Sequence, residues 1–152
     1  MKDFFKKIFL YHYKTNQKLL EAMELASEEN SEELLDIFSH SINAHQLWNA
    51  RIMGRKGLGV FQRHEWHHCE AWNKQNYFDT VDIIEAMKLE DTIDYTNSQG
   101  MKCQNSIEDI LFHISNHFSH HRGQLVRVMR EAGIKPPVTD YIFYKRPDGY
   151  SQ

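Results

Sequence analysis

Apolar residues recur at helical spacing along four long segments of the chain, and this periodicity limits the fold more than any other feature. In the first segment, for example, Phe5, Phe9 and Met23 fall on one side of a helical wheel. The four segments are residues 4–26, 30–54, roughly 70–88 and 107–129. We therefore predict four amphipathic helices.

Capping patterns predict where two of these helices begin. Asn30 with Glu33, and Asn105 with Glu108, have the spacing of a capping box, so they are expected to open the second and fourth helices. Gly133 supplies a stop signal after the fourth.

Two segments outside the helical pattern also have a predicted structure. The run Thr92–Thr96 is β-prone and is followed by turn residues, so residues 92–104 are expected to form a small β-hairpin. The apolar residues between Val138 and Tyr144 are expected to pack against the body of the protein. The glycine-containing stretch after residue 54 shows no period and is predicted to be a loop.

These elements predict an all-α fold, a four-helix bundle with one small hairpin. The short connection after residue 26 predicts that the first two helices are antiparallel neighbours. A length of 152 residues corresponds to one domain, residues 1–152.

Composition excludes several classes of function. The net charge of −3 argues against nucleic-acid binding, and the apolar runs are too short to span a membrane. The N-terminal stretch is interrupted by lysines and lacks the apolar core of a signal peptide. Cys69 and Cys103 have no motif spacing, so a reducing, cytoplasmic location is expected.

The histidines are the unusual part of the composition, ten in all, and three of them lie in the stretch ISNHFSHHRGQ. On a helical wheel, His121 lies about 40° and His117 about 80° from the centre of the apolar stripe, whereas His120 points to the flank. His117 and His121 are therefore an i,i+4 pair on the core side, a spacing that lets two imidazoles reach one metal ion. Alone, such a pair is more often a pair of packed side chains.

A third ligand from another helix would strengthen the metal interpretation, and the second helix offers His40 and His45. The wheel slightly favours His45, which lies nearer the centre of its stripe. His12 of the first helix also faces the core, where we favour a packed residue, with Asn16 as a nearby hydrogen-bond partner. The cluster of His64, His67, His68 and Cys69 lies in or beside a loop, and its members are expected to be exposed polar residues.

The chain also resembles the DinB family of the DinB/YfiT superfamily. The resemblance rests on FSHSINAHQLWNARI (38–52), on the N-H-x-x-x-H-R-G-Q run that begins at Asn116, and on the T-D-Y that ends at Tyr141. It implies a bundle of up-down-down-up order, commonly dimeric, in which three histidines hold a divalent metal ion. By position the ligands match His40, His117 and His121, and the choice of His40 over His45 comes from this resemblance.

Three imidazoles leave positions open on an ion, so the site can activate water, polarise a carbonyl or bind a thiol. All-imidazole ligation suits Zn, Ni, Fe or Cu. Asn43, Asn116 and Gln124 are candidates to orient the ligand rings. Trp48, the loop of residues 55–72 and the stretch Tyr141–Tyr144 are candidate walls of a substrate pocket.

The resemblance implies a metal-dependent enzyme, of the type that transfers groups to low-molecular-weight thiols or of the hydrolase type, with a small-molecule substrate and a homodimeric assembly. The alternatives are a non-catalytic, stress-related module, in which the metal only stabilises the bundle, and a dimeric interaction module whose histidines are merely packed. The sequence names no substrate.

Overall fold

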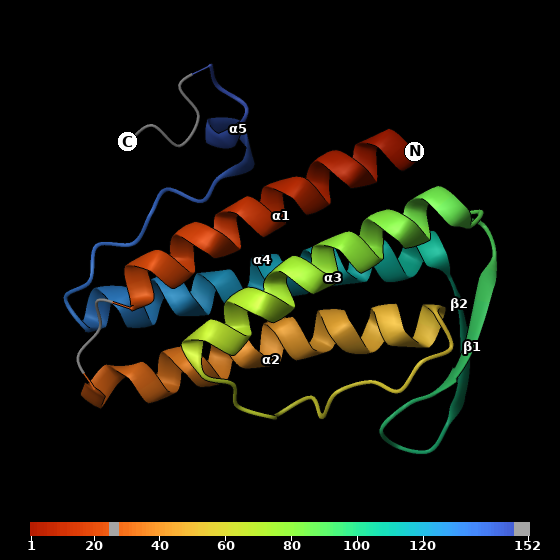
Figure 1. Cartoon of the computed structure of the whole chain (residues 1–152), viewed down its shortest axis with the longest axis horizontal. Helices are drawn as coiled ribbons and strands as arrows, with labels where there is room; N and C mark the ends of the chain where they lie inside the picture. The colour runs from red at the N-terminus through yellow and green to blue at the C-terminus, as the bar shows by residue number, and fades with distance from the viewer. Residues whose placement is uncertain (25–27, 148–152) are drawn as a thin grey trace.

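Four long helices form the bundle that the periodicity predicts, in a computed structural model that describes residues 1–24 and 28–147 (Figure 1). The elements are α1 (Lys2–Met23), α2 (Glu28–Ile52), α3 (Trp66–Ala86), β1 (Thr92–Thr96), β2 (Lys102–Ser106), α4 (Ile107–Glu131) and the short α5 (Tyr141–Tyr144). Within the described residues, no helix combines the length and apolarity needed to cross a bilayer.

The helices follow an up-down-down-up order, with α1 and α4 running one way and α2 and α3 the other (Figure 1). The main packing joins α1 to α3 and α2 to both α3 and α4. Helices α1 and α2 are antiparallel, as predicted, but they lie diagonally across the bundle. The prediction that they are neighbours was therefore wrong. The long loop of residues 53–65 returns the chain to the start of α3, which lets α3 run parallel to α2.

The stripes of the four helices meet in one apolar core. Its most completely enclosed large side chains come from all four helices: Phe9, Leu19, Met23, Leu34, Phe38, Ile42, Ile83, Ile84, Ile107, Ile110, Leu111 and Met129. Burial of side chains of this size stabilises the fold by about 1.5–3 kcal/mol each before conformational entropy is counted.

Both predicted helix starts were displaced. Helix α2 begins at Glu28, so Asn30 lies inside the helix, and the side chain of Asn30 lies outside the described residues. The cap of α4 is Ser106, whose hydroxyl accepts a hydrogen bond from the Asp109 amide at 3.2 Å. Asn105 instead lies within β2, where the hairpin holds it in register opposite Ile93.

The hairpin is confirmed, with β1 and β2 antiparallel and Thr92 paired with Ser106. The turn between them has Gly100 at φ +80°. Asn97 supports the turn because its side-chain oxygen accepts hydrogen bonds from the amides of Gln99 and Met101. The hairpin lies at the end of the bundle where α2 ends and α4 begins (Figure 1).

Two further expectations need correction. Helix α3 begins at Trp66, before the expected residue 70, and ends at Ala86. In the tail, the rings of Tyr141 and Tyr144 pack on Tyr11, as expected, but Ile142 stays 64% exposed, so only one side of the segment meets the body.

Candidate metal centre

Three histidine rings from two antiparallel helices converge at one side of the bundle. His40 lies on α2, and His117 and His121 lie one turn apart on α4. One nitrogen from each ring can be chosen so that all three lie within 4.8 Å of one another. All three side chains are half-buried, which leaves the cluster accessible from solvent.

The outer nitrogens of two rings are already held by oxygen atoms. His40 Nδ1 lies 3.2 Å from the carbonyl oxygen of Val60, and His121 Nδ1 lies 2.6 Å from Gln124 Oε1. Because both oxygens are acceptors, each Nδ1 donates a hydrogen to its partner, which leaves Nε2 as the nitrogen that can face a metal ion. This is the arrangement that orients histidine ligands toward a metal ion.

The inner nitrogens of the α4 pair face each other, with 3.1 Å between His117 Nε2 and His121 Nε2. Burial, followed by the neighbouring histidines 121, 40, 113 and 120, lowers the pKa of His117 to about 3. Burial also lowers the pKa of His121, against the opposing effect of its hydrogen bond to Gln124. Both rings are therefore neutral at neutral pH, which is the form that coordinates metal.

The loop of residues 53–65 completes the surroundings of His40. Asn43 Nδ2 donates to the Gln62 carbonyl at 2.6 Å and to the Val60 carbonyl at 3.4 Å. The ring of Phe61, itself 88% exposed, stacks on His40 with 5.2 Å between centroids. A Cβ on Gly57 would lie 2.5 Å from Leu47 Cδ1, so glycine there permits the loop's close approach to α2.

Of the three candidates to orient the ligand rings, Gln124 does so directly and Asn43 does so through the carbonyl of Val60. Asn116 is exposed, and within the described residues it makes no hydrogen bond to the three rings. The roles of Val60 and Phe61 were not foreseen. The backbone carbonyl leaves no trace in the sequence, and only the position of Phe61 within a glycine-containing loop hints at its role.

His45 and His12 lie away from the cluster and are packed residues. His45 Nε2 lies 2.7 Å from Thr80 Oγ1, and burial lowers the pKa of His45 to about 3. His12 contacts Ser115 Oγ at 2.9 Å and the Arg122 guanidinium at 2.7 Å. Asn16, the partner expected for His12, instead donates to Asn73, whereas the packed state of His12 agrees with expectation.

The expectation for the second histidine-rich segment was half wrong. His67 and His68 are exposed, as expected, but they lie in the first turn of α3. His64 is buried, where its Nε2 lies 2.6 Å from Asn43 Oδ1, and Cys69 is buried near Ser39. Burial raises the pKa of the Cys69 thiol to about 11, so it is not a reactive nucleophile.

Some of the candidate pocket walls border the three-histidine cluster and others do not. Residues of the 53–65 loop border the cluster, and Trp48 approaches it through His113, whose ring lies between those of Trp48 and His117 at 5.4 and 5.8 Å. The stretch Tyr141–Tyr144 does not border it, because α5 lies beside α1, away from α2 (Figure 1).

The fold and the three rings define a class of protein, a helical bundle whose three-histidine cluster is suited to hold a metal ion. The family model of the DinB family matches residues 1–151, so the chain belongs to the DinB family. No curated protein and no solved structure matches the chain.

Proposed function

We propose that the chain binds one divalent metal ion through Nε2 of His40, His117 and His121, and that this ion is the centre of an enzyme that acts on a small molecule. The observation that carries the proposal is the orientation of the rings. Their ligand atoms lie within 4.8 Å of one another, while oxygen acceptors hold the outer nitrogens of His40 and His121.

The donor set fits such an ion. Neutral imidazoles bind Zn, Ni, Fe or Cu. Within the described residues, the hydrogen-bond partner of His121 Nε2 is His117 Nε2, at 3.1 Å. A cation between the rings would bind all three inner nitrogens together. Among the described residues, the cluster contains three histidines and no carboxylate that would complete a closed fourth position.

When bound, a divalent ion held by three histidines acidifies water, polarises a carbonyl or stabilises a thiolate, which supports thiol transfer or hydrolysis. The chain itself supplies the orientation. Val60 and Gln124 fix the proton on Nδ1 of two ligands, and Phe61 places an apolar ring on the face of His40. The half-buried position excludes bulk water from one side of the cluster only, so a small molecule can approach from the other.

The test is a spectroscopic titration of Co(II)-loaded protein with 2-mercaptoethanol. An open position predicts a thiolate-to-cobalt absorption band that saturates with thiol and is absent in His117→Ala. A Co(II)-loaded protein that takes up no thiol, azide or cyanide would have a closed site, and the enzymatic proposal would then be wrong. Ser119→Ala, an exposed change on the same helix, is the control.

A further inference from the structure

A second feature of the same side of the molecule is a pocket of about 230 Å³ between α2, the hairpin and the start of α4. It is lined by Trp48, Tyr95, Asn105, Asp109, Ile110 and His113. Pockets that enclose a whole ligand usually measure roughly 300–1,000 Å³, so this one has room for part of a molecule.

The pocket adjoins the three-histidine cluster. His113 lines it and also lies 5.8 Å, between ring centroids, from His117. Asp109 stands two helical turns before His117 on α4, which separates them by roughly 12 Å along the helix axis. A molecule extending from the pocket past His113 therefore reaches the cluster.

The lining combines an aromatic corner with one carboxylate. Trp48 and Tyr95 meet edge to face at 81°, with 5.0 Å between centroids. Tyr95 is fixed because its hydroxyl donates to Asn105 Oδ1 at 2.8 Å. The faces of such rings attract organic cations, and the guanidinium of Arg51, which does not line the pocket, already lies 4.5 Å from the Trp48 ring and 4.7 Å from the Tyr95 ring.

Asp109 supplies the negative charge that a cation requires. The other ionisable groups that line the pocket are the His113 ring and the Tyr95 phenol. Its carboxylate makes no hydrogen bond or ion pair within residues 1–24 and 28–147, since only its backbone amide is engaged, by Ser106.

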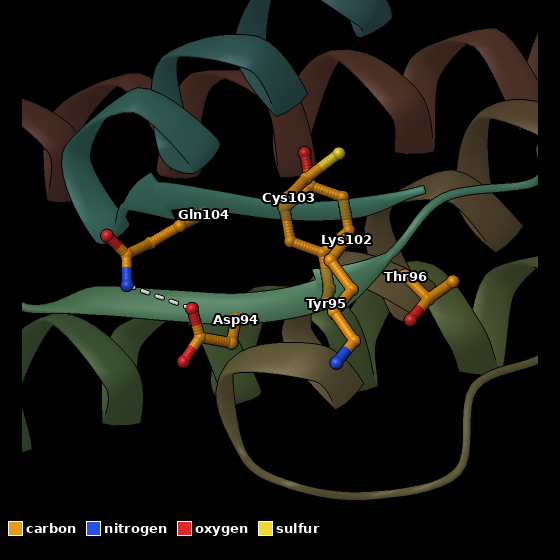
Figure 2. Close-up of a pocket in the computed structure, with 6 residues that line it drawn as sticks. All are labelled: Asp94, Tyr95, Thr96, Lys102, Cys103 and Gln104. Carbon is orange, nitrogen blue, oxygen red and sulfur yellow. Dashed lines mark hydrogen bonds between the residues drawn. The ribbon is translucent and has the colours of Figure 1, made fainter. Parts of the chain in front are cut away.

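The neighbouring pocket on the hairpin alone has a different character. It is lined by residues of both charges, among them Asp94 and Lys102. The side-chain amide of Gln104 donates to Asp94 Oδ1 at 2.9 Å, and Figure 2 shows this pair across the two strands. Its acidic group is already engaged, so it has no comparable preference for a cation.

We propose that the pocket of Trp48, Tyr95 and Asp109 binds an organic ammonium group, and that the substrate of the metal centre carries such a group roughly 12 Å from the atom that meets the metal. The assignment to the substrate of the metal centre rests on the proposed function, whereas the binding of an ammonium group does not.

The first experiment measures binding of benzyltrimethylammonium, a cation that cannot coordinate metal, by calorimetry on zinc-loaded and on chelator-treated protein. Binding to both forms is expected, about tenfold weaker in Asp109→Asn and for the neutral probe benzyl alcohol. Glu108→Gln removes the same charge from the same helix turn outside the pocket, so it should stay within about twofold of wild type. No binding, or equal loss in both variants, would overturn the proposal.

The second experiment tests the link to the metal. On Co(II)-loaded protein, mercaptooctyl-trimethylammonium should produce thiolate-to-cobalt absorption at a concentration about tenfold lower than mercaptooctanol does. Equal concentrations would overturn the assignment to the substrate. Failure of the proposed function gives a different result, in which zinc and cobalt are not retained but benzyltrimethylammonium still binds.

Discussion

At the residue scale, the most informative comparison is between His40 and His45, which lie five residues apart on α2. A helical wheel indicates how deeply a side chain is buried in the core. It slightly favours His45 as the ligand on α2, and His45 is indeed the more deeply buried of the two. Depth is the wrong criterion, however, because the centre of the core is filled and His45 finds a hydroxyl partner in Thr80. The α2 residue that joins the three-histidine cluster is His40, which is half-buried and faces α4, and His40 was chosen by family resemblance.

Gln124 is expected to tune the metal site. Gln124→Leu removes the acceptor 2.6 Å from His121 Nδ1, so the ring loses the contact that fixes its proton and orientation. Zinc affinity should fall by about 10–100-fold with little change in the fold. Competition titration with a chromophoric chelator measures this, and Gln75→Leu, an exposed change on α3, provides the control. Equal affinities in the two variants would contradict the role of Gln124.

At the element scale, the existence of the helices and the hairpin could be predicted, but their ends could not. Asn105 and Ser106 are both good cap residues with an acidic residue three positions later. The choice falls on Ser106 because strand pairing continues to that residue, where it meets Thr92. Similarly, α3 begins early because the burial of Cys69 and Asn73 fixes its first turns against the body.

Loss of the α4 cap should destabilise the protein measurably. Ser106→Ala leaves the Asp109 amide without its side-chain acceptor, which costs about 1 kcal/mol of unfolding free energy. Urea denaturation monitored by circular dichroism measures this change. Ser119→Ala makes the same substitution at an exposed position within α4 and should be close to neutral, so similar losses in both variants would contradict the capping role.

The buried histidines between helices predict acid sensitivity. His45 joins α2 to α3, and burial holds its pKa at about 3, well below its value in an unfolded chain. As the pH falls below about 6.5, His45 binds a proton in the unfolded chain but not in the folded one. The free energy of unfolding therefore falls by about 1.4 kcal/mol for each pH unit. Stability should thus be highest above pH 6.5 and decline toward pH 3.

The measurement is unfolding free energy against pH, in the presence of chelator, for wild type and His45→Gln. The variant should lose less stability between pH 7 and pH 5, by about 2 kcal/mol. Parallel pH profiles would show that His45 does not titrate as described. His12, whose pKa burial and Arg122 also lower, should leave a residual acid sensitivity in the variant.

At the scale of the whole molecule, the diagonal arrangement of α1 and α2 decides the site, because it leaves α2 packed against α4 and so places His40 opposite His117 and His121. Connection lengths alone favoured α1 and α2 as neighbours. Periodicity predicts which face of each helix is buried. It does not predict which helices pack together, because that depends on how the four apolar faces fit against one another. The homodimer and the single-domain organisation remain predictions.

Because the metal would bridge α2 and α4, its binding should stabilise the bundle. At a free zinc concentration about 100 times the dissociation constant, the gain is about 2.7 kcal/mol, which corresponds to a rise in melting temperature of about 5–10 °C for a chain of this size. Differential scanning calorimetry with and without zinc measures this rise. His117→Ala should show no rise, and an equal rise in that variant would place the stabilising ion elsewhere.

The central claim is that His40, His117 and His121 together hold one metal ion, and metal content after dialysis against buffered zinc tests it most directly. Wild type and His45→Gln should each retain about one zinc per chain, whereas His40→Ala should retain almost none. Zinc retained by His40→Ala, or lost from His45→Gln while its circular dichroism spectrum is unchanged, would contradict the account.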